Sequence, residues 1–155
     1  MKIWIDADAA PNEVKDVVFR AGKRLAIEVV VVANRSVAIP AAYATVKVVV
    51  VAGRPDEADR HIVEASAIGD LVVTADIALA SALVKKGVAA IDQRGDEYTD
   101  ENVSDRLGVR NLLDDLRGAS MRTSGPRPYD LRDKQGFAET FDRVVTRLTR
   151  RLKER

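Results

Sequence analysis

Two carboxylates near the start of the chain, Asp6 and Asp8, lie two residues apart and directly follow the apolar run Ile3 to Ile5. A short apolar run indicates a buried strand, and Pro11 favours the first turn of a helix soon afterwards. In an open parallel α/β sheet, ligands bind outside the carboxyl ends of the strands. Acids this close repel each other unless a cation or hydrogen-bond donors compensate them. The pair is therefore placed for chemistry, and a divalent metal ion is its simplest partner.

Other acids follow the third, fourth and fifth apolar runs, and Glu13 lies in the first turn of the first predicted helix, so all of them belong to one edge of the predicted sheet. Carboxylate oxygens without histidine or cysteine suit Mg²⁺ or Mn²⁺. Such an ion can lower the pKa of a bound water and stabilise charge on a phosphoryl oxygen. The candidate metal ligands are Asp6, Asp8, Glu13, Asp56, Asp59, Asp76 and Asp92.

Several of these acids also have a structural explanation. Asp76 can cap the helix that follows it, and Asp56 favours a helix start through the macrodipole. Asp92 can be a turn residue. Asp6 and Asp8 are harder to explain in this way, because neither begins an obvious helix. The pair is therefore the strongest signal in the chain.

Polar and basic residues follow two of the strands at the same edge. Asn34 and Arg35 come after the second apolar run, and Arg94 comes after the fifth. A guanidinium can hold a phosphate through two parallel hydrogen bonds, although either arginine could instead form a salt bridge to the acids. Asn34, Arg35 and Arg94 are therefore the candidate substrate-binding residues.

The composition excludes several kinds of site. The 155 residues include no cysteine and a single histidine, His61. Disulfides, thiolate metal sites and cysteine nucleophiles are therefore excluded, and zinc sites or histidine-based triads lack their usual residues. Catalysis would rest on carboxylates, hydroxyls, Lys or Arg. The apolar runs are far shorter than the roughly 20 residues of a membrane span, and no signal peptide is apparent. We expect a cytoplasmic protein without a membrane partner.

The net charge of +1 conceals an asymmetry along the chain. Residues 119–155 contain ten Lys or Arg and five Asp or Glu, which gives this part +5 and leaves −4 for the rest. The acidic part holds the candidate site, and the basic part could attract a polyanion.

Strands and helices alternate up to residue 92. Apolar runs predict strands at 3–5, 27–33, 46–52, 71–74 and 88–91, with helices at 11–25, about 55–67 and 76–86 between them. Beyond residue 92 we expect a short helix capped by Thr99, another at 111–117, a loop at 120–129 and a last helix from near Asp133. Its apolar face would comprise Phe137, Phe141, Val144, Val145, Leu148 and Leu152.

This order predicts the fold class and the domain organisation. Continuous apolar strands between helices indicate a parallel sheet covered on both faces. We expect an α/β chain forming one three-layer domain over residues 1–155, with a mostly parallel five-stranded sheet. Residues 1–92 would form the alternating core, and residues 93–155 a helical extension ending in a basic helix. An apolar patch on that helix could serve a homodimer.

Four stretches carry a family resemblance: KIWIDADAAPNEVK from Lys2, VANRS from Val32, GDLVVTADIALA from Gly69 and DQRGDEY from Asp92. They resemble the YaiI/YqxD family of uncharacterised bacterial proteins, and the likeness runs over nearly the whole chain. That family usually has Cys where this chain has Ala10.

The YaiI/YqxD family is in turn similar to PIN-like domains, which are metal-dependent nucleases with acids at the end of a parallel sheet. Residues 58–62, followed by the strand that ends Thr74-Ala75-Asp76, resemble the PIN pattern of an acid on a helix and then a strand ending Thr-x-Asp. The resemblance implies a PIN-like fold. It also implies that Asp6, Asp59 and Asp76 are the core metal ligands and catalytic residues.

Three functions remain open on the sequence. The leading hypothesis is an Mg²⁺- or Mn²⁺-dependent phosphodiesterase acting on RNA or single-stranded nucleic acid, with the basic last helix helping to hold the phosphate backbone. The second is a haloacid-dehalogenase-type phosphatase, with Asp6 as nucleophile and Asp8 as general acid. The third is a module that binds metal or nucleic acid without catalysis, because a fold alone does not specify an activity.

Overall fold

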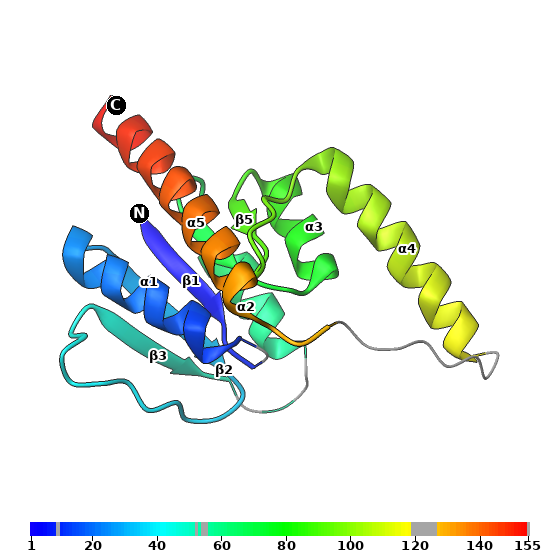
Figure 1. Ribbon diagram of the computed structural model, residues 1–155, viewed down its shortest axis with the longest axis horizontal. Coiled ribbons are helices and arrows are strands. Elements are labelled where there is room, and N and C mark those ends of the chain that lie inside the picture. The colour runs from blue at the N-terminus through cyan, green and yellow to red at the C-terminus, as the bar shows by residue number, and fades with distance from the viewer. Residues whose placement is uncertain (9, 52, 54–55, 119–126, 155) are drawn as a thin grey trace.

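Five parallel strands form the centre of the fold, in the order β3-β2-β1-β4-β5. The computed structural model (Figure 1) describes residues 1–8, 10–51, 53, 56–118 and 127–154. The strands are β1 (Lys2–Asp6), β2 (Glu28–Ala33), β3 (Val46–Val50), β4 (Leu71–Val73) and β5 (Ala89–Ile91). The helices are α1 (Asn12–Leu25), α2 (Glu57–Ala65), α3 (Ile77–Lys86), α4 (Asp100–Gly118) and α5 (Leu131–Lys153).

Helices cover both faces of the sheet, because the central strands are apolar on both sides. Ile3 and Ile5 of β1 belong to a core cluster that α1 and α5 complete. Trp4, which points to the other face, belongs to a second cluster with residues of α2, α3 and α4. The predicted α/β class, with three layers and five strands, is therefore confirmed, and the sheet is wholly parallel.

The strand register brings the carboxyl ends of the strands to one edge. Asp6 pairs with Val32, Ile5 pairs with Val73, and Val73 pairs with Ile91. The residues that follow β1, β2, β4 and β5 therefore emerge side by side, as expected for parallel strands. We call this side of the molecule the acid edge, because Asp6, Asp76 and Asp92 emerge there.

The region after residue 92 differs from the prediction in two places. One continuous helix, α4, replaces the two predicted helices, so the break expected between them was wrong. Gly108 lies inside α4, where a glycine lowers helix stability by about 1 kcal/mol but does not stop the backbone hydrogen bonding. The last helix begins at Leu131, two residues before the predicted start, because Asp130 and Asp133 form a capping box. Residues 120–126 of the predicted loop lie outside the described part.

The loop after β5 is fastened to the beginning of α5. Gly95 has a φ of 103°, and a Cβ atom there would lie 2.5 Å from the backbone of Gly136. Only glycine therefore allows these two segments to approach so closely. Thr140 donates a hydrogen bond to the carbonyl of Gly95 over 2.5 Å. Helix α5 thus packs against the loop as well as against the sheet.

A buried carboxylate closes the opposite end of the sheet. Asp70, which is 7% exposed, accepts hydrogen bonds from the backbone N–H of Lys2 at 2.9 Å, the indole of Trp4 at 3.1 Å and the backbone N–H of Ala67 at 3.0 Å. Three donors from two chain segments compensate the buried charge. Trp4 is a core residue, and the N–H of its indole is satisfied here.

This arrangement predicts the effect of removing the carboxylate. Asp70→Ala would leave three N–H groups without their acceptor and lower the free energy of unfolding by roughly 2–4 kcal/mol. Urea denaturation followed by circular dichroism measures the change. Glu139→Ala, which alters an exposed acid on α5, serves as the control and should change stability by less than about 0.5 kcal/mol. Equal stability of the two variants would contradict the role of Asp70.

Candidate active site

Three carboxylates from three separate elements meet at the acid edge. Asp6 ends β1, Asp59 lies in the first turn of α2, and Asp76 is the N-cap of α3. The charges of Asp6 and Asp76 both act on Asp59, and the Asp59 and Asp76 carboxyl groups share a hydrogen bond. All three side chains are half-buried. The structure therefore brings together the three residues that the resemblance implied as core ligands.

Thr74 connects two of these acids. Its side-chain hydroxyl donates to Oδ2 of Asp6 at 3.0 Å and accepts the backbone N–H of Asp76 at 3.0 Å. Thr74 is fully buried, and its carbonyl accepts the hydroxyl of Tyr98 at 3.1 Å. The sequence pattern did not single out Thr74. Its hydroxyl at the end of an apolar strand, two residues before an acid, could have indicated that it belongs to the site.

Asp76 has a double role. Its Oδ1 accepts the backbone N–H of Leu79 at 3.1 Å, which makes Asp76 the side-chain cap of α3. The capping role expected from the sequence is confirmed. The same carboxyl group takes part in the hydrogen bond with Asp59. Capping therefore fixes the direction in which Asp76 faces its neighbour.

Burial and mutual repulsion make the charged forms of the clustered carboxyl groups less stable. Burial, together with the charges of Asp76 and Asp6, raises the pKa of Asp59 to about 7. Burial also raises the pKa of Asp6, and the charges of Asp8 and Asp76 add to this, whereas the Thr74 hydrogen bond opposes it. A carboxylate with an elevated pKa in such a group gains stability from a bound cation.

Two further candidate acids flank the cluster from exposed positions. Oδ1 of Asp8 accepts the backbone N–H of Asn34 at 3.0 Å, and this contact joins the ends of β1 and β2. Asp56 lies 3.7 Å from Arg60 in an ion pair one turn apart, and its charge also acts on Asp59. Both acids therefore contribute negative potential to the edge, and each already has one polar partner.

Asp92 and Glu13 are engaged elsewhere along the edge. Asp92 lies 3.6 Å from Arg106 of α4 and accepts backbone hydrogen bonds from the turn that follows it. Burial nevertheless raises its pKa. Glu13 is exposed in the first turn of α1, and its charge acts on Tyr129. Asp92 therefore has structural partners of its own, whereas Glu13 acts on Tyr129 through its charge alone.

Arg94 forms a salt bridge, the alternative that the sequence left open, but its partner is not the acid cluster. Its guanidinium lies 2.8 Å from Asp133 and 2.6 Å from the carbonyl of Arg127, and it lies over the Tyr129 ring at 5.6 Å. Arg127 also pairs with Asp133, at 2.5 Å. Arg94 therefore holds the end of β5 to the start of α5.

A basic hollow of about 350 Å³ lies beside Asp8. Lys15 of α1 and the segment Asn34, Arg35 and Ser36 after β2 line it together with Asp8. Two of the three predicted substrate-binding residues are therefore brought together here, next to the acids. Lys15 was not predicted as a substrate-binding residue. It lies in the first turns of α1, and this place in the first βα unit could have indicated it.

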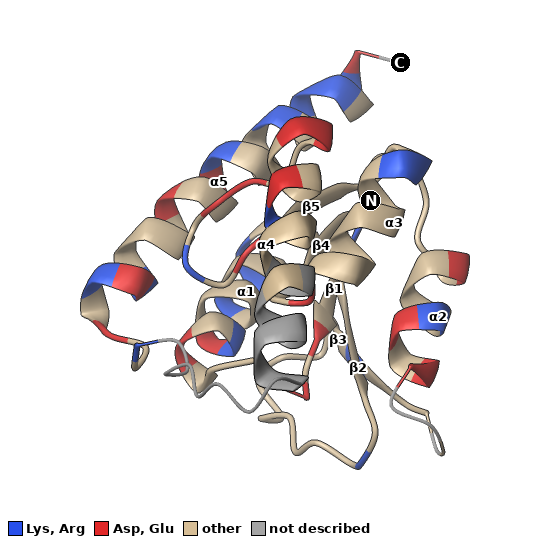
Figure 2. Cartoon of the chain, turned by 90° about the vertical axis from the view of Figure 1, so that its right-hand side faces the viewer, with Lys and Arg blue, Asp and Glu red and all other residues tan. Residues whose placement is uncertain are grey.

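The basic part of α5 lies at the other end of the molecule. Figure 2 shows Lys and Arg along α5 toward the C-terminus, and Thr149 contacts the sulfur of Met1 at 3.9 Å. Met1 precedes β1, so this half of the helix lies at the amino ends of the strands. The basic half of α5 therefore lies apart from the acids, and its binding of a polyanion stays a prediction.

The donor set of the acid edge fits a hard divalent cation. Within the described residues, no three carboxylate or histidine side chains form a ready-made metal-binding group. Mg²⁺, however, is commonly bound by one or two carboxylates together with water and substrate phosphate. Asp59 and Asp76 could provide such a pair, with Asp6 beside them. Burial raises the pKa values of Asp6 and Asp59, so a bound cation would stabilise their charged forms.

Comparisons with known proteins identify the family. Residues 4–147 match the family model described as "Uncharacterized BCR, YaiI/YqxD family". UPF0178 proteins from Myxococcus xanthus and Ectopseudomonas mendocina are each 47% identical over 150 residues, which is 97% of this chain and 97% and 100% of those proteins. The UPF0178 protein of Geobacter metallireducens is 46% identical over 153 residues, 99% of this chain and 98% of that protein. The chain belongs to the YaiI/YqxD family.

One further comparison and one feature of the helices bear on the structure. No solved structure matches the chain at a significant level. In the part of the chain that the structure describes, no helix has the length and apolar character needed to cross a membrane.

The raised pKa of Asp59 predicts how stability depends on pH. The folded chain holds this proton up to about pH 7, whereas the unfolded chain releases it near the ordinary value of 3.8. The unfolded chain binds fewer protons between these values, so the free energy of unfolding falls as pH rises through that window. Asp59→Asn removes this loss. We expect the variant to be more stable than wild type at pH 8 by roughly 1 kcal/mol, a modest figure because the carboxyl group is only half-buried.

Denaturation in EDTA at pH 4 and pH 8 measures this difference. At pH 4 the stabilities of Asp59→Asn and wild type should converge, because the wild-type carboxyl group is then largely protonated. Asp105→Asn, which alters an exposed acid on α4, should follow wild type at both pH values. An unchanged pH dependence in Asp59→Asn would show that Asp59 does not carry the raised pKa.

Proposed function

We propose that this YaiI/YqxD-family protein is a metal-dependent phosphodiesterase acting on RNA or single-stranded nucleic acid. The observation that carries the proposal is the meeting of Asp6, Asp59 and Asp76 at the carboxyl edge of the sheet, with the pKa of Asp59 raised to about 7. Clustered carboxylates with perturbed pKa values at such an edge are typical of functional sites. Their elements also follow the order of the acids in PIN-like domains.

Asp6, Asp59 and Asp76 would hold one or two Mg²⁺ or Mn²⁺ ions, with Asp8 and Asp56 adding negative charge nearby. When bound, the ions would supply a coordinated water of lowered pKa and would stabilise charge on the phosphoryl group. Carboxylates that repel one another in the free protein would gain a shared counter-ion. Capping of α3 explains Asp76, but it does not explain why Asp6 and Asp59 lie beside it, and a shared metal ion would.

The surrounding residues position the acids. Thr74 holds Oδ2 of Asp6 at 3.0 Å, and Leu79 holds Oδ1 of Asp76 at 3.1 Å, so each carboxyl group keeps a set orientation. Asp59 lies in the first turn of α2, and its carboxyl group shares a hydrogen bond with Asp76. A site of this kind depends on ligands whose directions are fixed before the ligand arrives.

The basic hollow beside Asp8 supports a nucleic-acid substrate. Lys15 and Arg35 would pair with a phosphate, and Asn34 and Ser36 would donate hydrogen bonds to it. Asp8 lies at the boundary between the hollow and the acids, so a chain of phosphates could occupy both regions. A single strand suits this arrangement, because its backbone can bend into an edge of limited size.

The first test measures metal binding and cleavage together. Mn²⁺ and Mg²⁺ are titrated calorimetrically into wild type, Asp59→Asn and the control Asp105→Asn, and the same samples are incubated with a mixed single-stranded RNA ladder. We expect saturable metal binding and cleavage in wild type and the control. In Asp59→Asn both should fall by at least about 100-fold, because a metal ligand is lost.

The other outcomes distinguish the alternatives. Metal binding without cleavage by wild type would overturn the phosphodiesterase proposal in favour of a binding module. A phosphoryl group trapped on Asp6 after incubation with a phosphate monoester would instead favour the phosphatase. Absence of metal binding by the folded wild type would remove both enzyme hypotheses.

A second variant tests the hollow separately. Arg35→Gln should weaken single-stranded RNA binding about fivefold to tenfold and leave Mn²⁺ affinity unchanged. The slope of log affinity against log salt concentration should fall by about 1, because one phosphate contact is lost. Arg20→Gln, an exposed change on the α1 surface, is the matched control. Fluorescence anisotropy with the inactive Asp59→Asn background at several salt concentrations gives both quantities. Equal RNA affinity of the two arginine variants would exclude the hollow as a phosphate site.

A further inference from the structure

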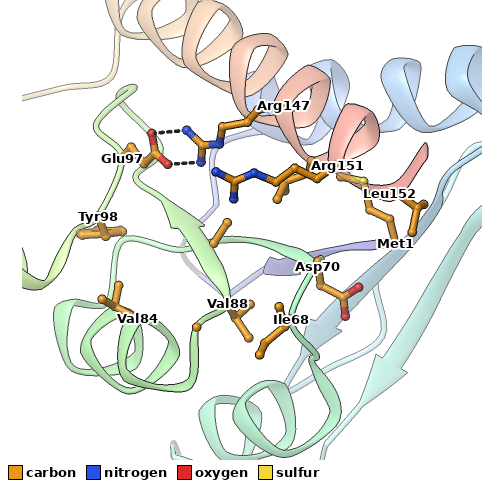
Figure 3. Close-up of a pocket in the computed structure, with 14 residues that line it drawn as sticks. Met1, Ile68, Asp70, Val84, Val88, Glu97, Tyr98, Arg147, Arg151 and Leu152 are labelled. Atoms are coloured by element: carbon orange, nitrogen blue, oxygen red, sulfur yellow. Dashed lines mark hydrogen bonds and ion pairs between the residues drawn. The ribbon is translucent and has the colours of Figure 1, made fainter. Parts of the chain in front are cut away.

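A second cavity, of about 320 Å³, lies at the amino ends of the strands, away from the acid edge (Figure 3). Gly69 and Asp70 before β4, Val88 and Ala89 at the start of β5, and the last turns of α5 line it. This volume is within the range of small-molecule sites, roughly 300–1,000 Å³. The cavity therefore has the size of a ligand site and is built by several segments that are distant in the sequence.

Apolar side chains form one part of the walls of this cavity, and charged side chains form another. Val88 and Leu148 are 2% and 8% exposed and form part of the core, and Val84 lies beside them. At the rim, Ile68 and Leu152 are 64% and 54% exposed. Large aliphatic side chains at the mouth of a cavity leave apolar surface in contact with water. An apolar group bound there would remove that surface from water.

Two arginines one helical turn apart on α5 bring positive charge to the same cavity. Arg147 pairs with both carboxylate oxygens of Glu97, one of them at 3.3 Å, yet its Nε is buried without a hydrogen-bond partner. Arg151 makes no ion pair or hydrogen bond within the described residues. Figure 3 shows its guanidinium lying beside that of Arg147.

The acids of the cavity do not neutralise Arg151. Both oxygens of Glu97 are taken by Arg147, as Figure 3 shows. Asp70 is buried and directs its two oxygens to three N–H donors around β1. The charge of the Arg151 guanidinium therefore has no acidic partner among the described residues, beside the apolar side chains of the cavity. Such a combination suits a ligand with an anionic head and an apolar body.

We propose that this cavity binds a small organic anion, with its carboxylate or phosphate head on Arg151 and Arg147 and its apolar body against Val84, Val88 and Leu148. The head would complete the hydrogen bonding of Arg151. The body would displace water from the apolar walls. Inorganic phosphate has the charge but no apolar body, and 1-octanol has the apolar body but no charge. We therefore expect both to bind weakly.

The test uses the full chain in EDTA, so that it does not depend on a metal ion at the acid edge. Octanoate, octyl phosphate, inorganic phosphate and 1-octanol are titrated calorimetrically into wild type. Chemical shifts of the Gly87 and Ala89 amides locate the binding. We expect saturable binding of octanoate or octyl phosphate, with the tighter of the two identifying the head group, and at least about tenfold weaker binding of octanol and inorganic phosphate.

Variants separate the charge from the apolar walls. Arg151→Gln alters an exposed side chain and should weaken binding of the preferred anion at least about tenfold without changing the circular dichroism spectrum. Arg143→Gln, an exposed change on the same helix, is the matched control and should bind like wild type. Val84→Phe should narrow the cavity and weaken binding even though Arg151 is retained.

Three results would overturn the proposal: no saturable binding of either anion, equal affinity of wild type and Arg151→Gln, or octanol binding as tightly as octanoate. The last would indicate an apolar patch without a head-group site. Asp59→Asn should retain the anion affinity of wild type. A failure here therefore leaves the phosphodiesterase proposal untouched, and the reverse also holds.

Discussion

Repulsion among half-buried carboxylates is the constraint on which the acid edge depends. Asp6, Asp59 and Asp76 are carried by three elements of the fold, and each element is held in place by the core beneath it. Burial, with the charges of the neighbouring carboxylates adding to it, raises the pKa values of Asp6 and Asp59. The hydrogen bond that Thr74 donates to Asp6 opposes this rise only in part. A fold that maintains such a cluster keeps an attraction for cations at one end of its sheet.

Positive charge is divided between the two ends of the sheet. At the acid edge, Lys15 and Arg35 line the basic hollow, whereas Arg94 is occupied by Asp133. At the amino ends, Arg147 and Arg151 border a cavity with apolar and charged walls. Because α5 spans the sheet from one end to the other, its start supports the acid edge and its basic half faces a separate region. The chain can therefore hold two chemically different sites on one scaffold.

Periodicity was a sound guide to the fold where local structure and burial agree. The five strands and the first three helices were predicted to within a few residues, since apolar runs and caps such as Asp76 act locally. The sequence could not show that Gly108 lies inside one long helix, because packing and continuous hydrogen bonding decide that. Nor could it show that Arg94 would meet Asp133, a partner 39 residues away.

The sequence by itself determined which side chains are available for a site and the edge of the sheet at which they lie. The chain has no cysteine and one histidine, and parallel strands that end in acids present those acids at one edge. The tertiary structure alone decided which acids interact. In the folded chain Asp59 shares a hydrogen bond with Asp76, and Asp92 forms an ion pair with Arg106. The basic half of α5 lies at the amino ends of the strands. The reason is physical: a strand end follows from local pattern, whereas distances between side chains follow from how whole elements pack.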